Sequence, residues 1–206
     1  MRRMSTAQAV RAIGRPIFTT GEIARLAHSS LSVTSRVLRS MATRGGVKRV
    51  VRGVWYLPDD PRFSVYSLIH YLAGGHRAYI SFVSALHLQG IIEQIPQLVY
   101  AATTGHTKLL RTSVGTFSFH RLTPELFGGF DWYQDRRDFL IATPEKALVD
   151  SLYLSSRRGA RFRFFPELEF PKGFSFRRAI RWARLIPYGP NRRHALTRLE
   201  QIRPRS

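Results

Sequence analysis

The sequence predicts an α+β fold made of a short N-terminal region of helices and a hairpin, a mixed α/β domain with a small sheet, and C-terminal helices. Three observations carry this prediction. Apolar residues recur at helical spacing between residues 19 and 43, and polar and apolar residues alternate over residues 114–122. A cluster of turn-forming residues at 58–61 separates the two kinds of pattern. We therefore expect two domains, residues 1–60 and residues 61–206.

The charge of the chain is concentrated at its two ends. The 206 residues carry a formal net charge of +20 and include no cysteine. Residues 1–60 hold 11 basic and 3 acidic residues (net +8), residues 61–160 hold 10 and 7 (net +3), and residues 161–206 hold 12 and 3 (net +9). Such a field attracts polyanions, although charge alone does not distinguish DNA from RNA or from an anionic membrane. The absence of cysteine removes disulfides and thiolate metal sites and fits a reducing compartment.

Helix signals begin close to the N-terminus. A short helix is expected over residues 5–13. Thr19 and Glu22 then match a capping box, in which each side chain bonds a free backbone N–H of the other residue, so a second helix should begin there. Its expected buried stripe consists of Ile23, Leu26 and Ala27.

A further helix is expected over residues 33–43, with Ser32 as its N-terminal cap. Gly45 and Gly46 mark its end, because glycine adopts the left-handed conformation at low cost. The helical spacing turns four residues inward, namely Thr34, Val37, Leu38 and Met41. It turns five residues outward, namely Ser32, Val33, Ser35, Arg36 and Arg39.

Residues 47–57 are typical of two short strands joined by a tip at Arg52 and Gly53. Two helices, a tight turn and a basic hairpin form the pattern of a winged helix-turn-helix, which places its second helix in the DNA major groove. An inert helical subdomain would share the spacing, but the hydroxyl and arginine side chains on the outward face favour DNA binding. The predicted DNA contacts are Ser32, Val33, Ser35, Arg36, Arg39, Lys48, Arg49 and Arg52.

The middle of the chain alternates helix and strand signals. A helix is expected over residues 65–72, and another is expected to start at the cap residue Ser81 and to end at Gly90. A third helix start combines Thr143 as cap, Pro144 at the first helical position and Glu145 in the positive first turn. Strands are expected over residues 98–103, 114–122 and 139–142.

Two amphipathic helices are expected near the C-terminus, over residues 175–186 and 191–202, and the chain is strongly basic from about residue 161. Their arginines could form the solvated face of a helical pair, or a second surface for DNA backbone or an acidic partner protein. Their number exceeds what solubility requires, which favours a contact surface. The arginines concerned are Arg177, Arg178, Arg181, Arg184, Arg192 and Arg193.

Catalytic motifs are missing from the sequence. The seven histidines have no metal-binding spacing, and neither a nucleophile elbow nor a phosphate-binding loop occurs. A metal-dependent nuclease is a further alternative, since it needs clustered carboxylates and often a lysine. Its candidate residues would be Asp131, Asp135, Asp138, Glu145 and Lys146. Their spacing is unfavourable, because neighbours on a helix point in different directions. We therefore expect no enzyme, no metal and no cofactor.

Signals for export and membrane insertion are missing as well. The basic N-terminus lacks an apolar core and a cleavage site, and no run of about 18 apolar residues occurs. We expect a cytoplasmic protein with no membrane partner.

Beyond the helix-turn-helix pattern, three stretches of sequence stand out. They are Tyr-Ile-Ser-Phe-Val-Ser-Ala-Leu at residues 79–86, Val-Tyr-Ala at 99–101, and Ala-Thr-Pro-Glu-Lys-Ala-Leu-Val-Asp at 142–150. Together they resemble the AbiEi family of abortive-infection antitoxins, also described as transcriptional regulators of viral defence systems. The resemblance spans about residues 6–153. Its most specific element is Thr-Pro-Glu-Lys-Ala-Leu followed by Asp, which we interpret as a helix start packed against the sheet.

The resemblance implies a type IV toxin–antitoxin role. In that family the winged helix binds inverted repeats in the promoter and represses the operon, and the C-terminal domain is needed to neutralise a partner nucleotidyltransferase toxin. The implied partners are double-stranded operator DNA and, functionally, such a toxin. Thr34 departs from the family pattern, because an aliphatic residue is more usual at its inward position. A stand-alone winged-helix regulator without a toxin is an alternative with the same architecture.

Overall fold

The structure is a computed structural model that describes residues 4–134, 138–156 and 167–204. The chain forms two compact units, each with helices and a sheet, so the predicted α+β class is confirmed. The first unit comprises Met1–Leu68 with Arg111–Gly115, and the second comprises Ile69–Leu110 with Thr116–Ser206. Within the described ranges, no helix combines the length and apolar character that a membrane span needs.

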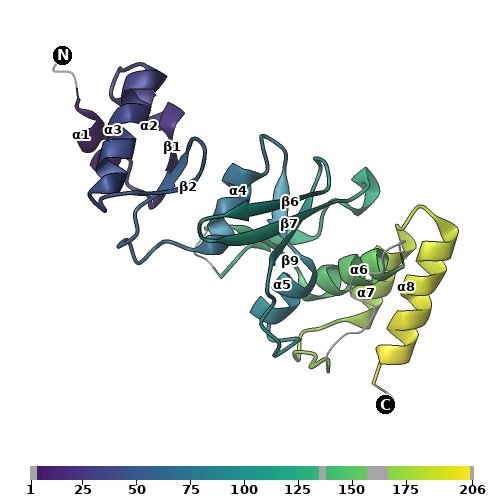
Figure 1. Cartoon of the computed structure of the whole chain (residues 1–206). Helices are drawn as coiled ribbons and strands as arrows, with labels where there is room; N and C mark the ends of the chain where they lie inside the picture. Colours follow the sequence, from purple (N-terminus) through teal and green to yellow (C-terminus); the bar gives the residue numbers. More distant parts are fainter. Residues whose placement is uncertain (1–3, 135–137, 157–166, 205–206) are drawn as a thin grey trace. The chain divides into compact units, whose positions relative to one another are not determined.

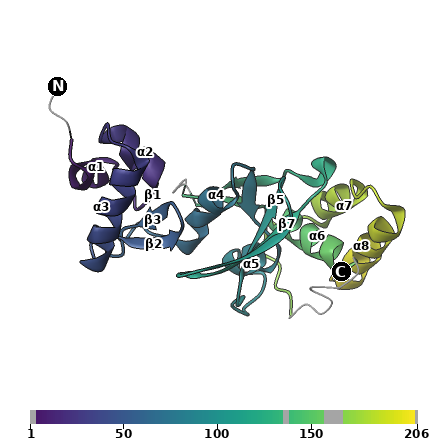
Figure 2. The same cartoon turned by 45° about the horizontal axis from the view of Figure 1, so that its top comes forward.

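The first unit combines helices with a three-stranded antiparallel sheet, drawn in purple and blue in Figures 1 and 2. Strand β3 lies between the other two, in the order β1-β3-β2. A 3-10 turn, Val65–Leu68, follows the sheet. The elements are α1 Thr6–Ala12, β1 Ile17–Thr19, α2 Thr20–Leu26, α3 Leu31–Thr43, β2 Lys48–Val51 and β3 Val54–Tyr56.

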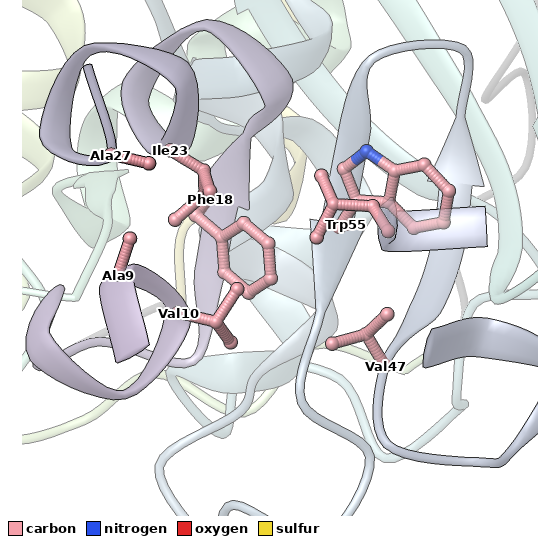
Figure 3. Close-up of a cluster of buried hydrophobic side chains, with 8 residues drawn as sticks. Ala9, Val10, Phe18, Ile23, Ala27, Val47 and Trp55 are labelled. Carbon is pink, nitrogen blue, oxygen red and sulfur yellow. The ribbon is translucent and has the colours of Figure 1, made fainter. Parts of the chain in front are cut away.

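One hydrophobic core joins all three of these helices to the sheet (Figure 3). Phe18 and Trp55 lie opposite each other in the β1–β3 register, and Trp55 Nε1 donates a hydrogen bond of 2.9 Å to Thr20 Oγ1. Burial of an apolar side chain contributes roughly 1.5–3 kcal/mol to folding, so this shared core fixes the helices on the sheet. Its members are Ala9, Val10, Phe18, Ile23, Ala27, Leu38, Val47 and Trp55.

The predicted boundaries of α2 and α3 are largely confirmed by their capping contacts. Thr19 and Glu22 form the capping box, with the Thr19 N–H donating to Glu22 Oε2 at 2.7 Å and the Glu22 N–H donating to Thr19 Oγ1 at 3.2 Å. At the end of α3, Gly45 adopts a φ of 80°. The N–H of Gly45 then bonds the Ala42 carbonyl and that of Gly46 bonds the Met41 carbonyl, which is the Schellman pattern.

Two sequence expectations in this region are wrong. Ser30, not Ser32, caps α3, because the Ser30 hydroxyl accepts the Val33 N–H at 3.3 Å and the helix begins at Leu31. Leu26 is 41% exposed instead of buried. Successive helical residues are about 100° apart, so Ile23 and Ala27 share the core side with Ala24, and Leu26 lies beyond the edge of that face.

The second unit contains a six-stranded mixed sheet in the order β6-β7-β5-β4-β9-β8. Strands β4 and β9 are parallel, as are β5 and β7, whereas β4–β5 and β8–β9 are antiparallel. The tip of the β6–β7 hairpin, Arg111–Gly115, is grouped with the first unit. The strands are β4 Ala78–Ile80, β5 Val99–Thr103, β6 Lys108–Thr112, β7 Gly115–Arg121, β8 Phe130–Trp132 and β9 Leu140–Ala142.

In the second unit, α6 packs against α5, α7 and α8. Every residue of α6 from Glu145 to Leu154 is buried. Figures 1 and 2 show α7 and α8, drawn in yellow-green and yellow, beside α6 at the end of the sheet. The elements are α4 Ile69–Leu72, α5 Phe82–Leu88, the 3-10 turn Pro124–Leu126, α6 Pro144–Ser155, α7 Phe176–Arg184 and α8 Gly189–Ile202.

The predicted start of α6 is confirmed in each part. Thr143 accepts the N–H of Lys146 at 3.4 Å and Pro144 occupies the first position. The expected cap at Ser81 is wrong in its chemistry, because Ser81 precedes α5 but its hydroxyl makes no capping bond. The residue after it, Phe82, is fully buried with a φ of 56°, a left-handed conformation that costs a non-glycine residue about 1–3 kcal/mol.

Candidate nucleic-acid interface

Helix α3 has one buried side and one solvent-facing side. Thr34 and Leu38 are both fully buried, which fixes the rotation of the helix on the core of the first unit. The opposite side contains the five predicted contacts, of which Ser32, Val33, Arg36 and Arg39 are exposed and Ser35 is partly exposed. Leu31, which the sequence reasoning did not select, lies beside them and is 62% exposed. The first turn of α3 therefore presents apolar and hydroxyl side chains, and the next two turns present arginines.

The hairpin after α3 presents its three basic residues to solvent. Val50 and Val54 are buried, and Gly53 turns the chain at the tip with a φ of 85°. A register shift between Arg49 and Val51 interrupts the strict alternation of β2. Lys48 and Arg49 are both exposed although they are adjacent, and Arg52 is exposed at the tip.

The positive charge on α3 and the hairpin is not neutralised locally. Within the described part of the first unit, the ion pairs are Arg15 with Glu22 and Arg62 with Asp60, and neither involves α3 or the hairpin. Arg39 Nε donates to the Ser35 carbonyl at 3.3 Å, which aligns the side chain along the helix. The core residues Leu38 of α3 and Val47 before β2 join the two elements. All eight predicted contacts thus belong to one compact unit.

The six arginines near the C-terminus do not form one surface. Arg178 donates to Glu145 Oε1 at 2.7 and 3.0 Å and to the Gly173 carbonyl at 2.6 Å, and Arg192 donates to the Ile186 carbonyl at 3.3 Å. These two are engaged within the fold, and Arg193 is exposed on α8. The other three line a hollow together with Arg203, which the sequence reasoning missed because it lies beyond the last helix. The three are Arg177, Arg181 and Arg184.

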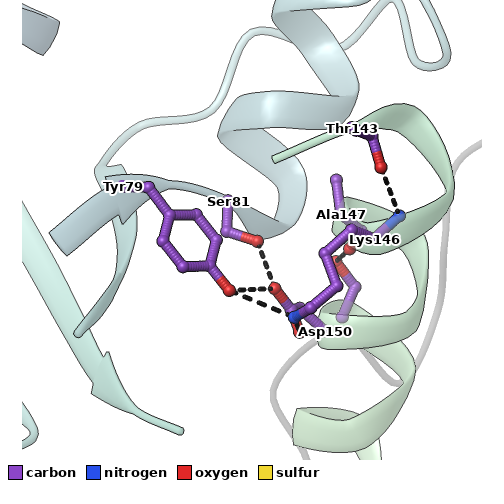
Figure 4. Close-up of polar contacts among 7 residues, drawn as sticks. Tyr79, Ser81, Thr143, Lys146, Ala147 and Asp150 are labelled. Carbon is purple, nitrogen blue, oxygen red and sulfur yellow. Dashed lines mark hydrogen bonds and ion pairs between the residues drawn. The ribbon is translucent and has the colours of Figure 1, made fainter. Parts of the chain in front are cut away.

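A sealed polar cluster lies between β4 and α6 (Figure 4). Lys146 Nζ forms an ion pair with Asp150 Oδ1 one helical turn later, and both side chains are fully buried. Asp150 Oδ2 accepts the Ser81 hydroxyl at 2.7 Å and the Tyr79 hydroxyl at 3.3 Å, and Lys146 Nζ donates to the Tyr79 oxygen at 3.1 Å. The Ser81 hydroxyl is therefore bonded to Asp150 instead of capping α5.

Burial dominates the electrostatics of this cluster. Desolvation lowers the pKa of Lys146 and raises the pKa of Asp150, and the attraction between the two groups opposes both shifts. The pKa of Tyr79 is raised well above its ordinary value, first by burial and then by the adjacent Asp150. The cluster joins the end of β4 to α6. Because the side chains of Lys146 and Asp150 have no exposed surface, a substrate cannot reach them in this structure.

Three of the residues considered for a nuclease have separate partners in the structure. Glu145 is paired with Arg178 and Lys146 with Asp150, while Asp131 Oδ1 accepts the N–H of Trp132. In the parts of the chain that the structure describes, no three His, Cys, Asp or Glu residues could hold a metal ion. Asp135 lies outside the described residues.

The sequence contained a signal for this cluster that spacing alone could have revealed. Lys146 and Asp150 are four residues apart with opposite charges on a mostly apolar helix, so they lie on one side of it. Their partners Tyr79 and Ser81 lie about seventy positions earlier, and only the pairing of β4 beside β9 brings them near.

Comparison with known proteins gives a likeness of fold. No protein-family model matches the chain, and no curated protein matches it. Among solved structures, the chain is similar to the crystal structure of the RV2827C protein from Mycobacterium tuberculosis, with a TM-score of 0.51 and 15% sequence identity. The match covers 100% of this chain and 85% of the other. At this level of sequence identity, the similarity indicates a shared fold alone.

Proposed function

We propose that the first unit is a winged helix-turn-helix that binds double-stranded DNA, with α3 in the major groove and the β2–β3 hairpin on the backbone. One observation carries the proposal. The solvent-facing side of α3 presents hydroxyl, apolar and arginine side chains, and the residues on its other side, Thr34 and Leu38, are fully buried. An α-helix fits the major groove of B-DNA, and such side chains are those that contact base edges and phosphates.

The side chains of this face suit different parts of the duplex. Arg36 and Arg39 are long enough to pair the two acceptors of a guanine edge, and Val33 is suited to the methyl group of thymine. Ser32 and Ser35 are short hydroxyl side chains near the helix start, where phosphate contacts are common. Lys48, Arg49 and Arg52 would contact phosphates without reading sequence.

We further propose that the protein is an antitoxin of the AbiEi type that represses its own operon and counteracts a nucleotidyltransferase toxin. The support is the resemblance in residues 79–86, 99–101 and 142–150. Those segments supply Tyr79, Ser81, Lys146 and Asp150, the four residues of the sealed cluster. The second unit would then hold the antitoxin activity, with inverted repeats in the promoter as the operator. A stand-alone regulator without a toxin is the alternative.

DNA binding is tested by selecting duplexes from a randomised pool and measuring affinity by fluorescence anisotropy. We expect Arg36→Ala to weaken binding to the selected site by about 1–3 kcal/mol and to relax preference at one base pair. Arg52→Ala should weaken selected and random duplexes equally and make the salt dependence shallower. Arg11→Ala, an exposed arginine on α1, is the matched control. Equal losses for Arg36→Ala on both duplexes would refute the base-reading role.

The antitoxin role is tested by co-expression. If a nucleotidyltransferase reading frame adjoins the gene, we expect its expression to arrest growth and co-expression of this chain to restore it. A variant defective in DNA binding, Arg36→Ala with Arg52→Ala, should still rescue growth, because the proposed antitoxin activity lies in the second unit. Arrest without rescue by the wild-type chain would leave the stand-alone regulator as the better account.

A further inference from the structure

A hollow along α7 is lined by four arginines and by two apolar side chains, Phe176 and Ile180, which we call its floor. It encloses about 430 Å³ and is lined by Phe176, Arg177, Ile180, Arg181, Arg184 and Arg203. The first three arginines repeat at intervals of four and three residues, so they form one row along the helix. Arg203 joins them from the segment after α8.

The four arginines of the hollow form a surplus of positive charge. In the ranges that the structure describes, none of these four arginines takes part in an ion pair. The sequence from residue 161 to 206 offers three acidic residues, Glu167, Glu169 and Glu200, against twelve basic ones. Arg178 on the same helix is a useful contrast, because it is held by Glu145. The row is therefore available to an external anion.

The floor of the hollow is apolar and firmly held. Phe176 and Ile180 are one helical turn apart, and the Phe176 ring packs edge-on against Phe170 and Phe174, with centroids 5.0 Å apart in both pairs. Ala179 and Ala183 on the other side of α7 are fully buried, and α7 packs against α6 and α8. Phe176 is thus held in place by ring contacts, and α7 by its buried alanines.

We propose that this hollow binds an acidic amphipathic helix of a partner protein. The apolar side chains of the partner would lie on Phe176 and Ile180, and its carboxylates would pair with Arg177, Arg181 and Arg184. An apolar stripe flanked by charge is how helix-in-groove recognition works, and guanidinium–carboxylate pairs are its strongest polar contacts. Duplex DNA would use the arginines but would gain nothing from an apolar floor. This site is independent of the DNA-binding role proposed for the first unit.

The test uses the full-length protein and a fluorescein-labelled helical peptide of about 18 residues, five turns, with leucines at helical spacing and glutamates elsewhere. A scrambled peptide of the same composition is its control. We expect the periodic peptide to bind at least about tenfold more tightly, a difference of 1.4 kcal/mol. Ile180→Asn should remove that preference, and Arg177→Glu with Arg181→Glu should abolish binding. Arg193→Glu, which changes an exposed arginine outside the hollow, should leave both peptides unaffected.

The DNA affinity of each variant separates this site from the first unit. Ile180→Asn should leave the affinity for a duplex unchanged. Its far-ultraviolet circular dichroism and melting temperature should match those of the wild-type chain, which checks that the second unit is folded. Equal binding of both peptides, or a periodic peptide indifferent to Ile180→Asn, would overturn the proposal. If the arginine variants instead lost duplex and peptide affinity together, the hollow would be a nucleic-acid surface and the partner-protein proposal would be wrong.

Discussion

Thr34 places a hydroxyl group in the core of the first unit. Its side chain is fully buried, and its oxygen has no hydrogen-bond partner among the described residues. A buried polar group without a partner costs about 1–3 kcal/mol relative to a satisfied one. The inward position of Thr34 also fixes the phase of α3, which decides that Arg36 and Arg39 face solvent.

We expect Thr34→Val to raise the free energy of unfolding by about 1 kcal/mol, because valine has nearly the same shape and no hydroxyl to desolvate. Urea denaturation followed by circular dichroism measures this change. Ser35→Val is the control. Ser35 is the next residue, rotated by about 100° around the helix axis and partly exposed, so its substitution should not stabilise the protein. A loss of stability in Thr34→Val would mean that the hydroxyl has a water partner.

The Lys146–Asp150 pair makes a second prediction at the scale of single residues. Removing one partner of a buried ion pair costs about 3–5 kcal/mol, since the other charge is left without compensation. We therefore expect Lys146→Met to destabilise the protein strongly. Lys146→Met combined with Asp150→Asn should cost less than Lys146→Met alone, because asparagine keeps a carbonyl for Ser81 and carries no charge.

A double-mutant cycle on the free energy of unfolding measures this coupling. Arg178→Met, which removes a pair whose arginine is half exposed, provides the comparison and should cost less than Lys146→Met. Additive losses in the cycle would show that the two charges act independently.

At the scale of elements, the start of α2 depends on an ionised glutamate. Burial would raise the pKa of Glu22, but hydrogen bonds from the Thr19 backbone and hydroxyl, together with Arg15, outweigh burial and lower it. A lowered pKa in the folded state contributes stability above the unfolded value of about 4.5 and loses it as the pH falls through the folded value.

We expect Glu22→Gln to lower the melting temperature near neutral pH, and to lower it less at an acidic pH well below the unfolded pKa of about 4.5. Glutamine still fills the capping box, so the difference isolates the charge. Glu93→Gln, which changes an exposed glutamate after α5, is the matched control and should change the melting temperature little. A loss of equal size at both pH values would assign the effect to shape instead of charge.

The same elements show how much of the fold can be predicted from neighbouring residues in the sequence. The starts of α2 and α6 could be predicted, because Thr19, Glu22, Thr143 and Pro144 act on backbone groups within three residues. Ser30 and Ser32 both suit a cap, so local sequence does not distinguish them, and the structure uses Ser30, whose hydroxyl accepts the Val33 N–H.

Short strands mark the limit of such reasoning. Strands β1, β4, β6 and β8 were not predicted, and three of them are only three residues long, too short for an alternation to be visible. Their existence depends on partners far along the chain, as in the pairing of Ile80 with Ile141. The residues of the candidate DNA-binding face belong to one helix and one hairpin and could be named from the sequence. For the sealed cluster, the sequence offers only the Lys146–Asp150 spacing, because Tyr79 and Ser81 come from a distant segment.

At the scale of the whole molecule, the net charge of +20 acts on folding and on DNA binding in opposite directions. Like charges repel in the compact state, so salt that screens them should stabilise the fold. The same salt competes with DNA phosphates for the basic residues of the first unit.

We therefore expect the melting temperature to rise and the affinity for duplex DNA to fall as sodium chloride is increased from about 0.05 to 0.2 M, roughly 14 to 7 Å in screening length. Differential scanning fluorimetry and anisotropy measure the two trends on one sample. Sucrose, which stabilises folds without screening charge, should raise the melting temperature and leave DNA affinity unchanged. A melting temperature that falls with salt would contradict the repulsion argument.

The carboxylate of Asp150 has a consequence for how the second unit opens. It connects Tyr79 and Ser81, at the end of β4, to Lys146 in the first turn of α6. If either segment opens alone, the three hydrogen bonds between them break, and the buried Lys146–Asp150 pair loses its partners Tyr79 and Ser81. The amide protons of β4 and α6 should therefore exchange with solvent at a common rate, as one cooperative unit, while those of the surface helix α8 exchange earlier.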